Sequence, residues 1–180
     1  MKCKAIEASQ LLNDFVLDLV VGTRSIELFE SQGIKARLSE SISLGLFRMA
    51  LFHILLTLFK WAEFYDRYNL IIPVELHDVC RDLRKQIGKG SIREFRNKYV
   101  GHIWDNDKKR PLLKEEVDIY FNQKFGDTVS FLQWVNRSNA VYPQTVVSIC
   151  EKVRDSLKVA HGITEKEMFP WADNPSDVGV

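Results

Sequence analysis

The segment SESISLGLFRMALFHILLTLFKWAEFYDRY, residues 39–68, indicates the architecture of this chain. Ser39 or Ser41 can cap a helix that continues to about Tyr68. Its middle is apolar on nearly every side, with large apolar side chains at positions 44, 46, 47, 49, 51, 52, 54, 55, 56, 58, 59 and 61. A helix without a polar face has to be covered on all sides. We therefore expect either the central helix of a monomeric core or a helix that also contacts a partner subunit.

The same segment is not expected to cross a membrane. Its most apolar part, Leu44 to Phe59, is shorter than the roughly 18 residues that a span requires. It also contains Arg48 and His53. The N-terminal residues MKCKAIE carry charged side chains where a secretory signal would have an apolar run. The sequence therefore predicts a cytoplasmic protein without a membrane-spanning segment.

Amphipathic patterns around this segment predict further helices. They cover residues 6–31, with a kink or break at Gly22–Thr23, residues 74–87, a helix from Ser91, and residues 113–125, 127–138 and 143–160. Residues 105–111 are polar and predict a loop, and Pro143 is expected in the first turn of the last helix. No segment alternates apolar and polar residues as a half-buried strand does. We expect a single all-α domain over residues 1–169, an up-and-down bundle of about five to seven helices, with a loose tail at 170–180.

Positive charge is concentrated in one region, although the formal net charge of the chain is only +1. Residues 81–110 hold ten Lys or Arg and four Asp or Glu side chains, which gives a local charge of +6. Such a region attracts phosphate groups and makes binding sensitive to salt. A solvated basic face has the same composition, and the sequence leaves both interpretations open.

Cysteine and histidine residues show no metal-binding pattern. The three cysteines, Cys3, Cys80 and Cys150, are far apart, and the four histidines are scattered. An odd number of widely spaced cysteines is typical of reduced thiols in a cytosolic protein. We expect neither a structural zinc ion nor another cofactor.

The centre of the basic region reads SIREFRNKYVGHIWD, residues 91–105. It contains Arg96, then Asn97, and His102 six residues after Arg96. On an ideal helix, Arg96 and His102 flank the apolar stripe on opposite sides, each about 60° from it, and lie about 9 Å apart along the axis. A phosphate group fits between them. Gly101 can end or bend the helix just before the imidazole.

These side chains suit RNA cleavage without a metal ion. His102 can act as general base or acid because imidazole titrates near neutral pH. Arg96 stays protonated and offers a two-pronged donor to phosphate oxygens. Asn97 could orient a water, a phosphate oxygen or the imidazole, although it points outward on an ideal helix. Arg93 and Lys98 also point outward, and we predict that they bind the RNA backbone. One chain supplies one such histidine, so a two-fold dimer would provide both base and acid.

The arrangement Arg96-Asn97-x4-His102, in a helical context, resembles the signature of the HEPN superfamily of small helical domains. The resemblance covers this short motif and the all-helical pattern. It implies a metal-independent endoribonuclease of the kind found in toxin–antitoxin and abortive-infection systems. Its catalytic residues would be Arg96, Asn97 and His102, in a composite cleft across a homodimer. RNA would be the substrate, and an antitoxin protein would be a further partner.

Two other interpretations stay open. Many HEPN-like domains have lost catalysis and serve as nucleic-acid-binding, nucleotide-binding or protein-interaction modules, in which Arg96 and His102 would bridge structural carboxylates. A domain held by an antitoxin would be inert until its release. Trp104 and Asp105 follow the histidine closely and could stack on a base and orient the imidazole, although Asp105 also suits a helix cap or a loop.

Overall fold

The computed structural model of the chain describes residues 1–31, 39–88, 104–105, 109–111, 119, 121–123 and 125–171. Within them the protein is an all-α bundle, as the sequence predicts. The helices are α1 (Lys2–Ser31), α3 (Glu40–Tyr68), α4 (His77–Gly88), α7 (Thr128–Val135), α8 (Val146–His161) and α9 (Glu165–Met168). The 3-10 turns η1 (Asn69–Ile71) and η2 (Val74–Leu76) connect α3 to α4. The short strands are β1 (Trp104–Asp105) and β2 (Arg110–Pro111).

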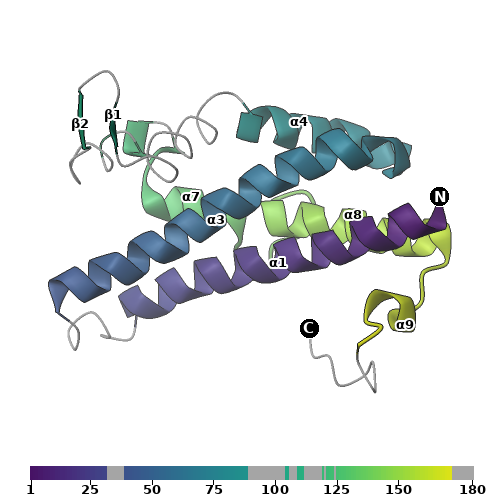
Figure 1. Cartoon of the computed structure of the whole chain (residues 1–180), viewed down its shortest axis with the longest axis horizontal. Helices are drawn as coiled ribbons and strands as arrows, with labels where there is room; N and C mark the ends of the chain where they lie inside the picture. The colour runs from purple at the N-terminus through teal and green to yellow at the C-terminus, as the bar shows by residue number, and fades with distance from the viewer. Residues whose placement is uncertain are drawn as a thin grey trace.

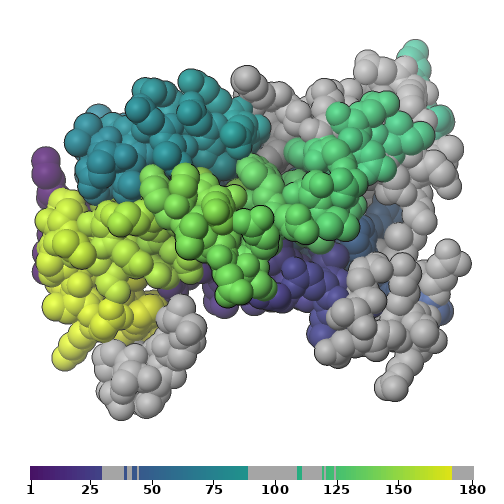
Figure 2. Space-filling model, turned by 180° about the vertical axis from the view of Figure 1, so that it is seen from behind, coloured from purple at the N-terminus to yellow at the C-terminus, as the bar shows by residue number. Residues whose placement is uncertain are grey.

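The long helices form two layers. α1 and α3 run antiparallel beside one another and lie in front of α7 and α8 (Figure 1). Figure 2 shows the opposite side, where α4, α7, α8 and the C-terminal segment make up most of the surface. α8 packs against α1, and α4 packs against α3. The outer face of the α1–α3 layer is therefore left uncovered by the other described helices.

α3 confirms the boundaries predicted for the apolar segment. The Ser39 side chain accepts a hydrogen bond from the Ile42 N–H at 3.4 Å, and the helix ends at Tyr68. Its inward side chains fill the core, with Leu51, Ile54, Leu55, Leu58, Trp61, Ala62, Phe64 and Tyr68 buried. Most of the predicted inward residues of α4 and α8 are buried against this core as well.

The apolar surface of α3 is only partly covered. Among the described residues, one helical stretch, Gly45–Ile71, is long and apolar enough to span a membrane by length and composition. The central helix of a water-soluble bundle meets the same criterion. In the most apolar part of this stretch, 39% is buried inside the protein. The buried part belongs to the core of the bundle, as predicted, while another part faces outward.

α1 corrects the predicted start and the predicted kink. It begins at Lys2 instead of residue 6, because Ala5 in its first turns packs with Ile163, Met168 and Phe169 of the C-terminal segment. It runs without a break through Gly22 and Thr23. Thr23 is buried within the helix, and its hydroxyl donates to the Leu19 and Val20 carbonyls, at 2.9 and 3.0 Å.

Gly22 is the point of closest approach between α1 and α3. A Cβ atom at this position would lie 2.7 Å from Cγ1 of Ile54, which is closer than real side chains come. Ile54 is fully buried in the core. Glycine is therefore required here by helix packing, and the prediction that it marks a break in the helix is wrong.

The predicted cap of α7, Asp127, is confirmed, since its side chain accepts a hydrogen bond from the Ser130 N–H. The end of α7 and the start of α8 differ from the prediction. α7 ends at Val135, three residues before the predicted 138, because Asn136 has an extended backbone and its side chain donates to Thr23 Oγ1. α8 begins at Val146, so Pro143 precedes the helix and is not in its first turn. Thr145 and Ser148 form a capping box there, with Ser148 N donating to Thr145 Oγ1 at 3.1 Å.

Two small elements were not predicted. The polar segment predicted as a loop contains the antiparallel strands β1 and β2, with Trp104 opposite Pro111 and Asp105 opposite Arg110. The short helix α9 precedes the predicted tail and is capped by Thr164. Of the helix predicted at 113–125, positions 119, 121–123 and 125 are helical, and Phe121 is buried. The helix predicted from Ser91 and the tail beyond residue 171 lie outside the described residues.

The close approach of α1 and α3 generates a prediction about two glycines. Gly22→Ala is expected to lower the free energy of unfolding by roughly 1–2 kcal/mol, because the new methyl group overpacks against Ile54. Gly45 in α3 is the matched control, since no atom lies within 4 Å of a Cβ added there. Gly45→Ala should raise stability by up to about 1 kcal/mol through helix propensity alone. Urea unfolding followed by circular dichroism measures both, and equal shifts of the same sign would contradict the proposed packing.

Candidate functional site

All five residues predicted for the ribonuclease site lie outside the described residues. They are Arg93, Arg96, Asn97, Lys98 and His102. The structure describes the chain on both sides of them, up to the end of α4 at Gly88 and again from Trp104 in β1. Their catalytic and RNA-binding roles remain predictions from the sequence.

The described part of the basic region is largely neutralised by carboxylates. Arg84 makes a two-pronged contact with Asp66 of α3, with Nε–Oδ1 at 2.9 Å and Nη2–Oδ2 at 2.7 Å. Within α4, Arg81 contacts Asp78 at 2.6 Å and Lys85 contacts Asp82 at 3.4 Å. Of the five basic side chains of this region that the structure describes, at least three thus have acidic partners, one of them contributed by another helix.

The Arg84–Asp66 contact fixes the helix from which the motif segment departs. It joins α4 to the C-terminal end of α3, close to the η1 turn. The hydrogen bond from Arg84 lowers the pKa of Asp66 below its ordinary value, against the opposing effect of burial. The position of α4 relative to the core is thereby held by charge as well as by Cys80, Leu83 and Ile87, which are buried.

Polar side chains of α1 and α3 come together where the two helices meet, with Thr57 buried and Asp18 and His53 partly exposed. His53 Nε2 lies 3.3 Å from Asp18 Oδ1, and the Thr57 hydroxyl donates to Asp18 Oδ2, also at 3.3 Å. Asp14 lies one turn before Asp18 on the same face of α1. Partial burial and the nearby Asp18 carboxylate raise the pKa of Asp14, while Lys60 opposes this shift. This cluster of polar side chains therefore includes carboxylates and, beside them, the positive charge of Lys60.

A cavity of about 170 Å³ continues this polar group toward the end of α3. Its lining residues come only from the two helices: Leu11 and Phe15 from α1, and Lys60, Glu63, Phe64, Arg67 and Tyr68 from α3. The aromatic side chains are buried and form the floor. Phe64 meets Phe15 edge-on at a centroid distance of 5.9 Å and stacks on Tyr68 at 5.0 Å. The charged side chains are exposed and form the rim.

The rim charges lie near opposite charges without direct contact, since Lys60 is close enough to Asp14 to affect the pKa of that carboxyl. Within the described part of the chain, Lys60, Glu63 and Arg67 make no ion pair. Glu7 lies near the Tyr68 hydroxyl, and burial together with this carboxylate raises the pKa of Tyr68. The cavity thus combines an apolar floor with unpaired charges at its opening, an arrangement typical of small-molecule sites.

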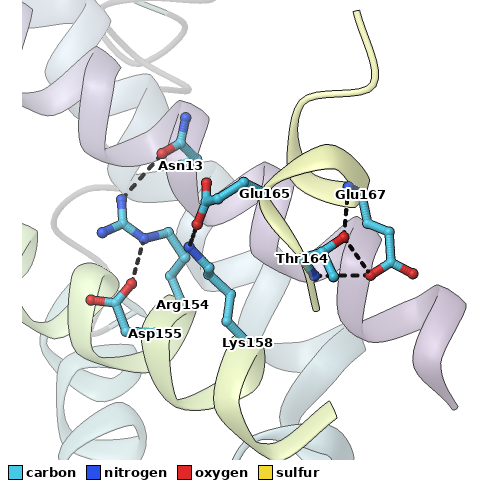
Figure 3. Close-up of polar contacts among 7 residues, drawn as sticks. All are labelled: Asn13, Arg154, Asp155, Lys158, Thr164, Glu165 and Glu167. Carbon is cyan, nitrogen blue, oxygen red and sulfur yellow. Dashed lines mark hydrogen bonds and ion pairs between the residues drawn. The ribbon is translucent and has the colours of Figure 1, made fainter. Parts of the chain in front are cut away.

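A second polar cluster connects α1 to the C-terminal segment. Figure 3 shows Arg154 of α8 reaching Asn13 of α1, with Nη1–Oδ1 at 3.1 Å, and Lys158 paired with Glu165 of α9. The side chain of Gln10 donates to the Glu167 and Met168 carbonyls, both at 3.2 Å. The contacts of Gln10 and Lys158 dock α9, and the Arg154–Asn13 contact joins α8 to α1.

Glu167 forms the salt bridge between α9 and the start of α1. Its carboxylate lies 2.8 Å from Lys2 Nζ and accepts the Thr164 N–H at 2.9 Å. Lys2 and this N–H lower the pKa of Glu167 to about 2. The carboxylate therefore stays ionised at all physiological pH values, and the dock is not a pH switch near neutrality.

The two buried cysteines are unreactive. Burial raises the pKa of Cys80 to about 12, and it raises that of Cys150 as well. Both thiols stay protonated at neutral pH, and the protonated form is a poor nucleophile and metal ligand. Across the described residues, no three His, Cys, Asp or Glu side chains come together in a way that could hold a metal ion.

The α1–α3 site was missed by the sequence prediction, which used His53 only as an argument against a membrane span. A weak signal was present, because Asp14 and Asp18 lie four residues apart on α1, and His53, Thr57 and Lys60 share one face of α3. Each set alone is typical of an ordinary solvated face. Only the antiparallel register of the two helices shows that they meet.

Comparison with known proteins shows the fold and no family. No protein-family model and no curated protein matches the chain. A solved structure, the integron cassette protein Vpc_cass2 from the mobile metagenome of V. paracholerae, matches with a TM-score of 0.70. The two chains are 22% identical, and the match covers 88% of this chain and 98% of that one. At this identity the likeness shows that the all-α architecture is shared.

The Arg84–Asp66 contact generates a prediction about acid. Because the pKa of Asp66 is lowered in the folded protein, its contribution is complete above the ordinary aspartate pKa of 3.8 and is lost as the pH falls below it. Asp66→Asn should therefore lower the melting temperature at pH 7 and have less effect at pH 3. Asp78→Asn, which removes the exposed partner of Arg81, is the matched control and should change little. An Asp66→Asn effect independent of pH would contradict this electrostatic role.

Proposed function

We propose that the protein is a HEPN-like, metal-independent endoribonuclease, of the kind that serves as the toxin in toxin–antitoxin or abortive-infection systems. The observation that carries the proposal is the spacing Arg96-Asn97-x4-His102 within a chain whose described part is an all-α bundle. The fold is consistent with the proposal but does not select it, because helical bundles host many functions.

The chemistry needs three actions on one phosphodiester. A base removes the proton of the 2′-hydroxyl, whose oxygen attacks the adjacent phosphorus. An acid protonates the departing 5′-oxygen, and the products are a 2′,3′-cyclic phosphate and a 5′-hydroxyl. His102 would serve as base in one subunit and as acid in the other. Arg96 would stabilise the charge on the phosphorane, with Asn97 as a positioning residue.

A homodimer is part of this proposal, and the exposed apolar side chains of the α1–α3 layer support it. Leu17, Val21 and Leu28 of α1 and Ile42, Met49 and Leu56 of α3 are exposed, Met49 to 69%. A contiguous exposed apolar surface is typical of a protein interface. α3 would then be both the central helix of the bundle and a contact with the partner, so the two alternatives for this helix are compatible.

The remaining parts of the proposal concern RNA and location. RNA would approach the basic region, where Arg93 and Lys98 would contact its backbone, and the protein would act in the cytoplasm. An antitoxin protein would be a further partner. The ion pairs of Arg81, Arg84 and Lys85 leave these α4 cations less available to RNA.

We predict that the purified protein cleaves labelled RNA in the presence of EDTA and leaves 2′,3′-cyclic phosphate ends. His102→Ala should reduce the rate by about 10²–10⁴-fold, the usual contribution of general acid–base catalysis. Arg96→Ala should cost a similar factor. Arg96→Lys should restore only part of the rate, because an ammonium group lacks the fork of the guanidinium. Asn97→Ala should have a milder effect.

Two results would rule out the nuclease. One is RNA left intact by the parent protein, and the other is cleavage that persists unchanged in His102→Ala. The alternative, a binding module without catalysis, predicts RNA binding without cleavage. In that case Arg93→Glu and Lys98→Glu should weaken binding and flatten its dependence on salt. Binding that both variants leave unchanged would identify the basic region as a solvated face.

The dimer is predicted to depend on the exposed apolar residues of the α1–α3 layer. Light scattering at roughly tens of micromolar should give the mass of a dimer, and Met49→Glu combined with Val21→Glu should give that of a monomer. Val159→Glu is the control, since Val159 is even more exposed than Met49 and Val21 but lies on α8. A parent protein that is monomeric at this concentration would contradict the composite site.

A further inference from the structure

We propose that the cavity between α1 and α3 binds a free amino acid with an aromatic or branched apolar side chain. The site is lined by Leu11, Phe15, Lys60, Glu63, Phe64, Arg67 and Tyr68. The proposal rests on the described geometry of these two helices and is independent of the ribonuclease.

The size and floor of the cavity select the apolar part of the ligand. Its volume is about 170 Å³. An apolar protein cavity of roughly 150 Å³ accommodates benzene. The floor is built of three aromatic rings, with Phe15 edge-on to Phe64 and Phe64 stacked on Tyr68. Phe15, Phe64 and Tyr68 are each at most 5% exposed. A phenyl or branched aliphatic group would therefore pack against Leu11, which is partly exposed, and against the small part of the rings that reaches the cavity.

The charges on the rim select the polar part. Lys60, Glu63 and Arg67 are spaced by three and four residues, so they lie on one stripe of α3. The two cations flank the carboxylate, and all three line the same cavity. Within the described residues none of them has an ion-pair partner that a ligand would have to displace.

Charges of both signs favour a zwitterion over a simple anion. Lys60 and Arg67 can bind a carboxylate, and Glu63 can accept hydrogen bonds from an ammonium group. Two more acids, Asp14 and Glu7, lie near the rim, the first beside Lys60 and the second beside Tyr68. An anion without a positive group would face this excess of carboxylates. An α-amino acid satisfies both signs while its side chain occupies the aromatic floor.

The test uses four probe compounds on the full-length protein, with binding measured by saturation-transfer difference NMR. L-phenylalanine carries all three recognised groups, 3-phenylpropanoate lacks the ammonium group, 2-phenylethylamine lacks the carboxylate, and L-alanine lacks the ring. L-phenylalanine should bind with a Kd of roughly millimolar or tighter. The compounds lacking one charge should bind about two- to five-fold more weakly, the range of partly exposed charge pairs. L-alanine should bind about ten-fold or more weakly than L-phenylalanine, because it has no ring to bury.

Substitutions of the rim residues test which protein charge binds which charged group of the ligand. Glu63→Gln should reduce the difference in affinity between L-phenylalanine and 3-phenylpropanoate, because the nearest partner of the ammonium group is gone while Asp14 and Glu7 remain near the rim. Lys60→Gln combined with Arg67→Gln should make L-phenylalanine and 2-phenylethylamine bind equally. Lys152→Gln is the matched control, since it removes an exposed cation of α8, and it should bind all four compounds like the parent protein. Leu11→Trp should fill the cavity and abolish binding, with thermal unfolding confirming that the variant is folded.

Three results would overturn the proposal. The first is that L-phenylalanine shows no binding at a concentration of about 10 mM, which is above the expected Kd. The second is binding that Leu11→Trp leaves intact in a folded protein, which would place the ligand elsewhere. The third is 3-phenylpropanoate binding the parent as tightly as L-phenylalanine, which would identify a site for organic anions.

Discussion

The close packing of α1 against α3 at Gly22 and Ile54 is the constraint on which the rest of the structure depends. A glycine on one helix lets the β-branched side chain of the other lie almost against its backbone. This contact favours the observed register of the two antiparallel helices, because a shift of one turn along α1 would place a larger side chain against Ile54. That register brings Asp18 opposite His53 and Thr57, and it places Phe15 against Phe64. This polar group and the cavity are consequences of the same contact.

The second layer depends on this register through polar contacts. Asn136, which ends α7, donates to the hydroxyl of Thr23, next to the critical glycine. Arg154 of α8 donates to Asn13, nearly three turns earlier on α1 than Thr23. On the other side, Arg84 joins α4 to Asp66 of α3. The first two connections join elements more than 100 residues apart in sequence, and the third joins consecutive helices. The helices are therefore positioned by a few directed contacts in addition to the apolar core.

The sequence predicted those features that depend on local patterns. The cap at Ser39, the end of α3 and the inward stripe of α8 follow from residues within one or two turns. The missed features depend on partners distant in sequence. α1 starts early because Ala5 packs on Phe169, and α7 stops early because Asn136 finds Thr23. The same distinction applies to function, since the Arg96–His102 motif is a local pattern, while the α1–α3 cavity requires two helices whose pairing cannot be read from either one.

The exposed surface of α3 has a pattern of its own that relates the dimer to the cavity. Its exposed positions include 42, 45, 49, 53, 56, 60, 63 and 67, spaced by three or four residues, so they form one stripe along the helix. The stripe changes character along its length. Ile42, Met49 and Leu56 belong to the apolar part, and Lys60, Glu63 and Arg67 to the charged part.

α1 shows the same change in the opposite chain direction, as antiparallel pairing requires, with Val21 and Leu28 at the apolar end and Asp14 and Glu7 at the charged end. Burying the charged end in a subunit interface would desolvate at least three unpaired ions at a cost that apolar contact cannot offset. An interface is therefore favoured only over the apolar end. The cavity would stay open to solvent in such a dimer, and ligand binding and subunit association can occur on one face without competing.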